Sequence, residues 1–459
     1  MPKFTWEEII TATGAKEYLA PSDRSEKVTD VVTDTRRITP GTLFVALKGE
    51  KFNGEDFAKE ALAKGAAGVM VSLECPAEKL PTAGGTVVRV ADTLKAYQDI
   101  AGYYRQKFAL PLVAITGSNG KTTTKDLTAA ALSPLGEVLK TQGNFNNEIG
   151  LPLTLLGLKE NHAAAVVEIG MRGLHQIEAL AKVARPTIGV VTNVGETHME
   201  LLGSMDNIAR AKGEMVEAIN PGGTVILNAD NEYVAKMTGK AKPGVKILTF
   251  GFSEKADVRG ENVVTEEGRT AFTATYQGQS QTYTLPLVGQ HNVSNALASI
   301  AVALSLNVKP AEIAAGLAQA AVSHMRLECA KMNDYLVVND AYNASPMSMQ
   351  AAIETVSQMA TGRKIAVMGD MLELGKVAVE AHQKVGRQLA EHQFAVVVTR
   401  GEMGAYIAQA AKEAGVSEVY DCPSHEAAAK VLRETLRPGD TVLFKGSRGM
   451  AMDKIIELL

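Results

Sequence analysis

The chain has 459 residues, of which 46% are hydrophobic and 21% are charged. These fractions are typical of a globular protein, and the length suggests about three domains. The net charge is −4, from 47 basic and 51 acidic residues, and no basic block is present, so a nucleic-acid-binding groove is not indicated.

The cysteines and the apolar runs bear on the cell compartment. Cys75, Cys329 and Cys422 lie far apart and match no metal-binding spacing, which is typical of reduced thiols in a cytosolic protein. Residues 1–10 lack an apolar signal core, and no uncharged run approaches the roughly 20 residues of a membrane helix. We therefore expect a cytoplasmic protein.

Residues 1–108 are predicted to form a small α/β domain. Short strands are indicated at 28–32, 42–47 and 68–71. A helix is predicted at 94–108, where apolar residues recur near helical spacing. We expect this helix to connect the first domain to the second.

The second predicted domain, residues 109–322, opens with the most informative stretch of the chain. The apolar run 112–115 predicts a strand, and residues 126–132 predict a helix. Between them, residues 116–124 read Thr-Gly-Ser-Asn-Gly-Lys-Thr-Thr-Thr. The turn is shorter than the usual Walker form, because Ile115 stands where that form has its first glycine.

This order of strand, glycine-rich turn and helix predicts a phosphate site. The backbone N–H groups of the turn and the helix N-terminus can cradle phosphate oxygens. Lys121 would neutralise the β- and γ-phosphates, and the Thr122 hydroxyl would bind the accompanying Mg²⁺. An ordinary turn in a sheet that binds no nucleotide is the alternative.

The rest of this domain alternates between strands and helices. Strands are indicated at 164–169, 188–192 and 224–227, with helical patterns between them. This alternation is typical of a parallel sheet with helices on both faces. Short polar–apolar alternation at 247–287 predicts an antiparallel insert, and an alanine-rich helix follows at 295–306.

Residues 323–459 are predicted to form a third, Rossmann-like α/β domain. Its strands are indicated at 335–339, 364–368, 394–398 and 442–444, and each ends in a loop of polar residues or glycine. Ligands of open α/β sheets bind outside the carboxyl ends of the strands. The pattern therefore predicts a second ligand-binding face.

Four ionisable residues outside the phosphate loop are candidates for chemistry. Glu168 ends one predicted strand and His198 follows the next, so both can lie beside the phosphate loop and bind Mg²⁺. Lys212 falls in a predicted helix, where the residue pattern alone indicates a surface lysine. Arg326 lies between the second and third domains and could reach a γ-phosphate on closure or pair with Glu328.

Together these stretches resemble the Mur ligases, the ATP-dependent amide-forming enzymes of peptidoglycan precursor synthesis. Order and spacing match from residue 28 to the C-terminus. The motifs that carry the resemblance are residues 116–123, 168–170, 195–198, 210–214, 289–295 and 325–328.

The two ends of the chain indicate which member of the family it resembles. Residues 340–346, 368–375 and 445–448 are similar to the member that adds D-alanyl-D-alanine. An Asp-Asn-Pro-Arg motif, which marks the ligase that takes diaminopimelate, is absent from the sequence. Residues 34–36 and 41–49 resemble the UDP-substrate domain that these two members share.

The resemblance implies an activity and its partners. A Mur ligase of this kind uses ATP and Mg²⁺ to phosphorylate the terminal carboxylate of UDP-MurNAc-tripeptide. The amine of D-Ala-D-Ala then attacks the acyl phosphate, and ADP and phosphate are released. The family also implies a monomer, and the sequence leaves open whether the third stem residue is lysine or diaminopimelate.

The resemblance also implies roles for individual residues. The implied catalytic residues are Lys121, Glu168, His198, Lys212 and Arg326. ATP would be held by Gly117, Ser118, Asn119, Gly120, Lys121, Thr122, Thr123, Asn292, Asn295, Arg326 and Asp340. Mg²⁺ would be bound by Thr122, Glu168, His198 and a carbamylated Lys212.

The two substrates would be bound by other residues. The UDP substrate would contact Asp34, Thr35, Arg36, Lys48, Gly49, Asn146 and Asn147. The dipeptide would contact Asn343, Ser345 and Pro346. Ser345 departs from the family, which more often has Asn at this position.

Other hypotheses about the function compete with this interpretation. Within the superfamily, the ligase that adds the third residue and folylpolyglutamate synthetase use related motifs. A nucleotide-dependent switch without chemistry is a rival from another class. It would bind ATP and show no acceptor-dependent hydrolysis.

Overall fold

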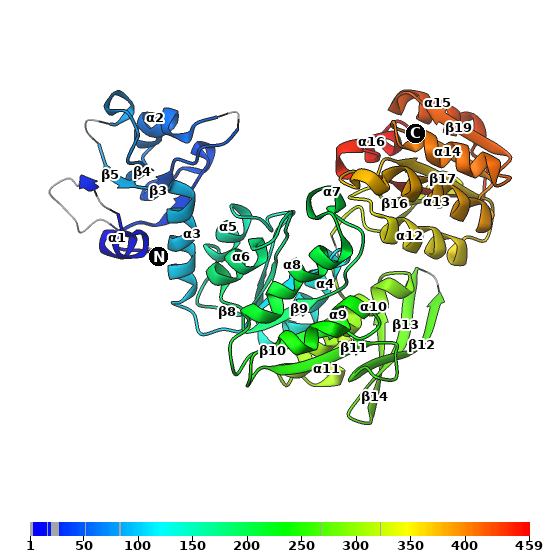
Figure 1. Cartoon of the computed structure of the whole chain (residues 1–459), viewed down its shortest axis with the longest axis horizontal. Helices are drawn as coiled ribbons and strands as arrows, with labels where there is room; N and C mark the ends of the chain where they lie inside the picture. Colours follow the sequence, from blue (N-terminus) through cyan, green and yellow to red (C-terminus); the bar gives the residue numbers. More distant parts are fainter. Residues whose placement is uncertain are drawn as a thin grey trace.

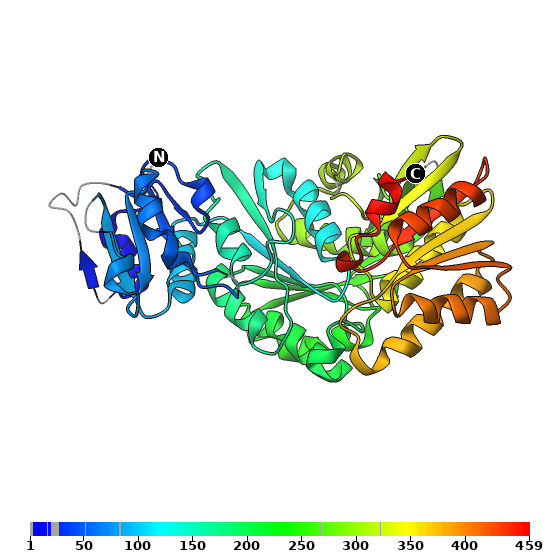
Figure 2. The same cartoon turned by 90° about the horizontal axis from the view of Figure 1, so that it is seen from above.

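The structure is a computed structural model of the chain, and it describes residues 3–15, 17–19, 27–50, 52–81, 84–266, 268–321 and 323–459. The described strands form sheets of five, nine and six strands. Figures 1 and 2 show three bodies in a row, with the nine-stranded sheet in the middle. None of the described helices is long and apolar enough to cross a bilayer.

The first sheet has the strand order β1-β5-β4-β3-β2, and only β1 pairs antiparallel among its described strands. Its strands are β1 (Glu17–Leu19), β2 (Asp30–Val32), β3 (Thr42–Val45), β4 (Gly68–Ser72) and β5 (Thr86–Val90). Helices α1 (Trp6–Thr13) and α2 (Ala58–Ala63) accompany it. The strands predicted in this part of the chain are present, although β2 and β3 are shorter than expected.

Helix α3 (Thr93–Arg105) joins the first sheet to the second. It begins where the Asp92 carboxylate accepts from the backbone N–H groups of Leu94 and Lys95. It packs on α1 and also on α5 (Gly150–Leu155) and α6 (Gln176–Ala184). The helix ends at Arg105, not at Phe108 as predicted, because the Arg105 side chain donates to the carbonyls of Phe108 and Leu110 and stabilises a turn there.

The central sheet has the order β14-β13-β12-β11-β10-β9-β6-β8-β7. Its strands are β6 (Leu112–Thr116), β7 (Glu137–Lys140), β8 (His162–Glu168), β9 (Ile188–Val191), β10 (Thr224–Asn228), β11 (Lys246–Gly251), β12 (Val258–Glu266), β13 (Arg269–Tyr276) and β14 (Gln279–Leu285). The sheet is parallel from β7 to β12 and antiparallel from β12 to β14.

Strand β6 lies inside the sheet between β8 and β9, and it is buried on both faces. Because side chains alternate along a strand, Val113 and Ile115 pack under one helix layer, and Leu112 and Ala114 pack under the other. The first layer is α4 (Lys121–Leu132), α10 (Gln290–Ser305) and α11 (Pro310–Ala318), and the second is α3, α5, α6 and α8 (Met205–Ala218). The short helices α7 (Met199–Leu202) and α9 (Glu232–Ala235) lie in connections. This burial explains why β6 reads as a continuous apolar run.

The antiparallel insert is smaller than the sequence predicted. The expectation of an insert at 247–287 was wrong for β11, which pairs in parallel with β10 as a regular strand of the central sheet. β11 mixes polar and apolar residues because only its C-terminal end is buried, so its sequence lacks the continuous apolar run of a strand buried on both faces. The predicted helix at 295–306 is α10, which begins five residues earlier at Gln290, after Gly289 with φ of 95°.

The third sheet has the order β15-β16-β20-β17-β18-β19, and β15 alone among its described strands is antiparallel. Its strands are β15 (Glu328–Met332), β16 (Tyr335–Asp340), β17 (Lys364–Gly369), β18 (Val396–Arg400), β19 (Glu418–Cys422) and β20 (Thr441–Lys445). Its helices are α12 (Pro346–Met359), α13 (Ala378–Glu391), α14 (Gly404–Glu413), α15 (His425–Thr435) and α16 (Asp453–Glu457). Residue 322, where the predicted second domain ends, lies outside the described residues.

Two helical glycines provide a test of the packing. A Cβ added to Gly386 of α13 would lie 2.4 Å from the backbone oxygen of Ile407 in α14, whereas one added to Gly102 of α3 would come no closer than 3.5 Å to the backbone of Val183. We expect Gly386→Ala to cost about 1–3 kcal/mol from overpacking. Gly102→Ala, the control, should gain roughly 0.5–1 kcal/mol from helix propensity. Equal shifts of the two unfolding midpoints would contradict this helix packing.

Candidate active site

The predicted phosphate loop connects β6 to α4. Its conformation requires glycine at two positions, because φ is 151° at Gly117 and 79° at Gly120, and an added Cβ would lie 1.9 Å from Thr192 Oγ1 or 2.4 Å from Asn295 Oδ1 respectively. Ser118 N donates to the carbonyl of Asn193 over 2.9 Å, which ties the loop to the segment after β9. The conformation of this turn is therefore specified by Thr192 and Asn193 after β9 and by Asn295 of α10.

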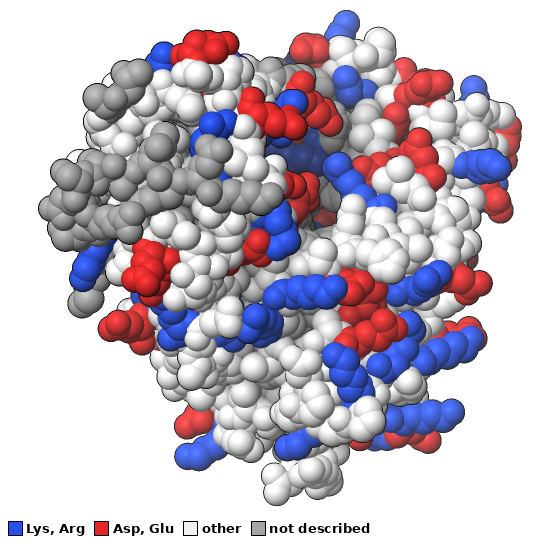
Figure 3. Space-filling model, turned by 60° about the vertical axis from the view of Figure 1, so that its left-hand side comes forward, with Lys and Arg blue, Asp and Glu red and all other residues white. Residues whose placement is uncertain are grey.

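A cavity of about 1180 Å³ opens beside this loop. It is lined by residues of the central and third sheets and their loops, and by Gln98 of α3. The predicted site residues that line it are Gly117, Ser118, Asn119, Gly120, Lys121, Thr122, Thr123, Asn146, Asn147, Glu168, His198, Lys212, Asn292, Asn295, Arg326, Asp340, Asn343 and Ser345. In Figure 3 the surface is hollowed between the upper parts of the molecule, with Lys and Arg side chains in the depth and Asp and Glu side chains at the rim.

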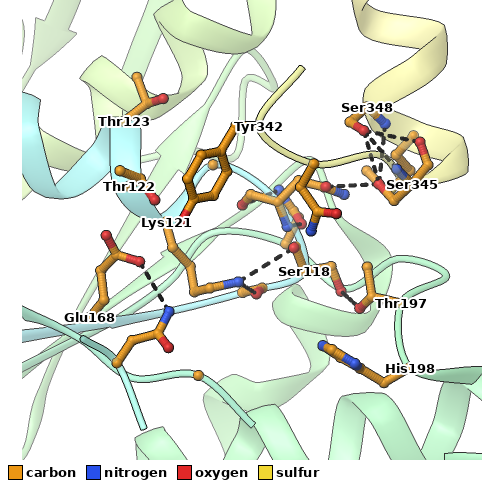
Figure 4. A pocket seen from close by; sticks show the side chains of 18 of the residues that line it. Ser118, Lys121, Thr122, Thr123, Glu168, Thr197, His198, Tyr342, Ser345 and Ser348 are labelled. Atoms are coloured by element: carbon orange, nitrogen blue, oxygen red, sulfur yellow. Dashed lines mark hydrogen bonds between the residues drawn. The ribbon is translucent and has the colours of Figure 1, made fainter. Parts of the chain in front are cut away.

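Lys121 and Glu168 enter the cavity from adjacent elements of the central sheet (Figure 4). Lys121 Nζ donates to the carbonyl of Gly117 over 2.7 Å. Burial lowers the pKa of Lys121, with Glu168 opposing this shift and Arg326 adding to it. Glu168 is 1% exposed, and its Oε1 has no hydrogen-bond partner in the described part of the chain. A buried carboxylate oxygen without a donor fits a hard cation.

Lys212 corrects an expectation from the sequence. The residue pattern indicated a surface lysine, yet Lys212 is 2% exposed. It lies one turn after Ile208 and one turn before Met215 on α8, and both of these residues pack in the core. Burial and the neighbouring Lys121 lower the pKa of Lys212 well below its ordinary value. A neutral amine at this position can react as a nucleophile.

His198 faces the third domain as well as the cavity. Its Nδ1 lies 2.6 Å from Glu373 Oε2. Burial lowers the pKa of His198, and Glu373 opposes that shift. Among the described residues, no group of three or more His, Cys, Asp and Glu side chains is placed to hold a metal ion. The predicted Mg²⁺ set contains one Glu and one His, so it depends on Thr122 and on Lys212 as an anion.

Helix α10 presents two asparagines to the loop. Asn295 Oδ1 accepts from Thr124 Oγ1 over 3.2 Å, and Asn295 Nδ2 donates to Asn292 Oδ1 over 3.2 Å. Asn292 Nδ2 donates to the carbonyl of Val288 over 2.8 Å. The bond from Thr124 joins α4 to α10 beside the phosphate loop, and the other two orient the asparagine amides.

Arg326 reaches the phosphate loop from the linker to the third domain. Its Nη2 donates to Thr122 Oγ1 over 2.8 Å, and its guanidinium lies 4.3 Å from the ring centroid of Tyr342. The alternative pairing with Glu328 is not formed, because Glu328 bonds to His324 and to the backbone N–H of Met325. The contact with Thr122 leaves the guanidinium beside the predicted phosphate site.

Other residues of the third domain close the cavity on its far side. Asp340 accepts from the backbone N–H of Leu327 over 3.2 Å and forms an ion pair with the buried Lys445. Ser345 caps the N-terminus of α12, and its Oγ donates to Asn119 Oδ1 over 2.8 Å. Figure 4 shows Ser345 and Ser348 at the start of this helix.

Some predicted residues do not reach the cavity. Asp34, Thr35, Arg36, Lys48, Gly49 and Pro346 lie outside its lining. Asp34 instead accepts from the Arg36 side chain and backbone, which lowers the pKa of Asp34 to about 2. Pro346 occupies the first turn of α12, where its missing N–H costs nothing.

Several contributors were missed by the sequence reasoning. Tyr342, Glu373 and Lys445 line the cavity. Lys125 and Asp126 form a buried ion pair on α4, the helix that follows the phosphate loop. Glu373 falls in the motif at 368–375, which indicated the family member but gave Glu373 no role of its own. The burial of Lys125 and Asp126 leaves no local signal, because it depends on strands and a linker far along the chain.

A buried charge network supports the loop. Asp126 Oδ1 accepts from Lys140 Nζ over 2.6 Å and lies 3.2 Å from Lys125 Nζ. Asp126 Oδ2 accepts from both the backbone N–H and the hydroxyl of Ser323 in the linker. Burial alone would raise the pKa of Asp126, but Lys125, Lys140 and Ser323 hold it below its ordinary value. Lys125 Nζ also lies 3.9 Å from Glu168 Oε1.

The fold and the cavity define a multidomain P-loop protein in which two mostly parallel sheets share one ligand site. Family models match three parts of the chain: the Mur ligase family catalytic domain at 27–105, the Mur ligase middle domain at 115–303 and the Mur ligase glutamate ligase domain at 325–448.

Named relatives are similar along almost the whole chain. UDP-N-acetylmuramoyl-tripeptide--D-alanyl-D-alanine ligase of Bacillus subtilis is 39% identical over 93% of this chain and 92% of its own length. The ligase of the same name from Escherichia coli is 36% identical over 94% of this chain and 93% of its own length. The crystal structure of MurF from Acinetobacter baumannii has a TM-score of 0.90 at 32% identity, covering 100% of this chain and 98% of that chain. MurF ligase from Thermotoga maritima in complex with ADP has a TM-score of 0.84 at 27% identity, covering 94% and 96%. The chain belongs to the Mur ligase family.

The buried network yields a stability prediction. Asp126→Asn leaves two lysines facing a neutral amide, so we expect the central domain to lose about 3 kcal/mol of unfolding free energy. Asp99→Asn, in an exposed pair with Lys95, is the matched control and should change it by less than about 1 kcal/mol. Urea titration measures both. A mild effect at Asp126 would mean that the lysines are solvated and the network is not formed.

Proposed function

We propose that the chain is an ATP-dependent ligase that joins D-alanyl-D-alanine to UDP-MurNAc-tripeptide and releases ADP and phosphate. The observation that carries the proposal is the single cavity in which the phosphate loop, Glu168 and residues of the third domain meet. The names of its relatives supply the substrate class.

We assign one ligand to each part of the chain. Residues 1–108 would bind the UDP moiety, with Asp34, Thr35, Arg36, Lys48 and Gly49 as contacts. Residues 109–322 would bind ATP, and residues 323–459 would bind the incoming dipeptide. Asn146 and Asn147 line the cavity and would meet the stem peptide as it enters.

In the first step, an oxygen of the stem carboxylate attacks the γ-phosphorus of ATP. The bond from that phosphorus to the β–γ bridging oxygen breaks, and ADP leaves. Two anions must approach each other, so the site must neutralise charge and align the reactants. Lys121 and the loop N–H groups would hold the phosphates. Arg326 would reach the γ-phosphate from the linker, 2.8 Å from Thr122.

In the second step, the dipeptide amine attacks the acyl carbon. The carbon–oxygen bond to phosphate breaks, the amine loses its proton, and an amide remains. Asn343 and Ser345 would position the dipeptide, with Pro346 shaping the first turn of α12. Asn292, Asn295 and Asp340 would hold the nucleotide, so ATP would be gripped from two domains and water excluded from the acyl phosphate.

Mg²⁺ would be held by Thr122, Glu168, His198 and a carbamylated Lys212. The ion supplies positive charge to the phosphate oxygens when bound. The buried, unpartnered Glu168 Oε1 supports this assignment. Carbamylation needs a neutral amine, and burial, which lowers the pKa of Lys212 well below its ordinary value, favours that form. The modified lysine would be an anion, which suits a cation site better than a buried ammonium.

ATP and UDP-linked precursors are cytoplasmic metabolites, so we place the reaction in the cytoplasm. The proposal needs one copy of the chain, since the residues assigned to ATP, Mg²⁺ and the dipeptide, apart from Pro346, line one cavity.

An acceptor screen tests the function directly. Phosphate release with ATP and UDP-MurNAc-tripeptide should require D-Ala-D-Ala and should not respond to diaminopimelate, lysine or glutamate. Tripeptides with lysine or diaminopimelate at position three would be compared in the same assay. Lys121→Ala should lower the rate by at least about 100-fold, because it removes charge from the transferring phosphoryl group. Release driven by glutamate would favour a folylpolyglutamate synthetase, and no acceptor dependence would favour a switch.

Chemical rescue tests the modified lysine. Lys212→Ala should lower the rate of phosphate release by at least about 100-fold, because a charged group at the phosphoryl site is lost. Formate or acetate should restore part of the rate, because a carboxylate can take the place of the carbamate. Lys182→Ala, at an exposed side chain of α6, is the control and should behave as the unaltered protein with and without acid. The carbamate assignment is contradicted if formate or acetate does not raise the rate of Lys212→Ala. It is also contradicted if the acid raises the rate of the Lys182→Ala control equally.

A further inference from the structure

The motif at 368–375 forms a loop between β17 and α13, and its residues 370–375 are called the Glu373 loop here. Its shape is set within the third domain. Ser447 N donates to the carbonyl of Asp370 over 2.9 Å, and Leu372 N donates to Ser447 Oγ over 2.9 Å. Met371 N donates to His382 Nε2 over 2.9 Å. The loop is therefore held firmly before any contact with the central domain is considered.

The same loop reaches across to the central domain. Glu373 Oε2 lies 2.6 Å from His198 Nδ1, and Glu200 N donates to the carbonyl of Glu373 over 3.3 Å. A Cβ on Gly375 would lie 3.1 Å from Glu200 Cα, which is tighter than ordinary contact, and Gly375 has φ of 57°, so this approach favours glycine. Figure 1 places α7, which follows His198, on the side of the central domain that faces the third domain.

Backbone strain marks both sides of this contact. His198 has φ of 55° and Glu373 has φ of 63°, and non-glycine residues seldom adopt such values. Strained backbone persists where the surroundings require it, and it is concentrated at functional sites. The contact itself is partly exposed, with the His198 and Glu373 side chains 28% and 42% accessible, so it is a weak source of stability. The strain is therefore better explained by a positioning role than by stability.

The bond also specifies the chemistry of the imidazole. A carboxylate beside Nδ1 accepts a hydrogen bond, so the neutral ring carries its proton on Nδ1. Nε2 then keeps its lone pair for a ligand in the cavity that His198 lines. A carboxylate acting on the far nitrogen of a ligating histidine fixes both ring orientation and tautomer.

We propose that Glu373 is a positioning residue that sets the tautomer and orientation of His198 from the third domain. The central domain alone would then lack a correctly prepared His198. Docking of the third domain, which would carry the dipeptide, completes the phosphoryl-transfer site. This inference rests on the proposed function for its catalytic consequence, but the contact and the tautomer can be measured without it.

The test uses the full chain with Glu373→Ala and Glu373→Asp. Glu380→Ala is the matched control, because Glu380 is an exposed glutamate of the same domain on α13. Imidazole ¹⁵N shifts, assigned with His198→Gln, report the tautomer. The unaltered chain should show the proton on His198 Nδ1. Glu373→Ala should move it to Nε2, and Glu373→Asp should keep part of the Nδ1–H form.

Kinetics supply the second readout. Glu373→Ala should lower kcat by about 10–100-fold, the usual effect of removing such a partner. The KM for ATP should change by less than about 2-fold, because the phosphate loop is untouched. Glu373→Asp should recover part of kcat, and Glu380→Ala should match the unaltered chain. Gly375→Ala, which displaces the loop while keeping Glu373, should lower kcat as Glu373→Ala does.

The outcomes separate the two ideas. An unchanged His198 tautomer in Glu373→Ala contradicts the inference, whatever the activity. A changed tautomer with an unchanged kcat also contradicts it, because the ring would then be prepared without effect. If the unaltered chain fails the acceptor screen, the proposed function is wrong, and the tautomer still decides whether Glu373 positions His198.

Discussion

The carboxylate of Asp126 lies buried between lysines of the central domain and the linker to the third domain. One turn earlier on the same face of α4, Thr122 accepts from Arg326 of that linker. The linker is thus held along α4 at two points, Ser323 and Arg326. Removing one charge from such a buried group leaves the others unpaired, which costs more than the pair contributes. The linker that leads to the third domain is therefore placed beside the phosphate loop by its contacts with α4.

The same network extends to the predicted metal carboxylate. Lys125 Nζ donates to the carbonyl of Thr141 over 2.8 Å, and Thr141 Oγ1 accepts from the backbone N–H of Glu168 over 3.0 Å. Glu168 is therefore connected through Thr141 and Lys125 to Asp126, which contacts the linker at Ser323. The linker and the predicted cation ligand thus share a support, and a short chain of direct contacts connects the linker to Glu168.

Much of this site could be predicted because its residues lie in short sequence motifs next to predicted strands. The phosphate loop follows from the spacing of Gly117, Gly120 and Lys121 after an apolar strand, and Glu168 follows from its place at a strand end. The burial of Lys212 could not be predicted, because one face of α8 decides it only after α8 packs on the sheet. β15 and β19 were missed because both are short edge strands that mix polar and apolar residues and are largely unburied. The pairing of His198 with Glu373 joins residues 175 positions apart, and no local pattern encodes it.

Helix α3 has a consequence for which substrates can react. It packs on α1 at one end and on α5 and α6 along its length, and Gln98 from its middle lines the cavity and donates to the carbonyl of Glu148 over 3.1 Å. The first sheet is thereby fixed at a set span from the phosphate loop. On the proposed assignment, a nucleotide anchored near Asp34 must extend its peptide across that span. On that assignment, the fixed distance would select substrates by length. A stem peptide one residue too short would not reach the phosphate loop, whatever its side chains.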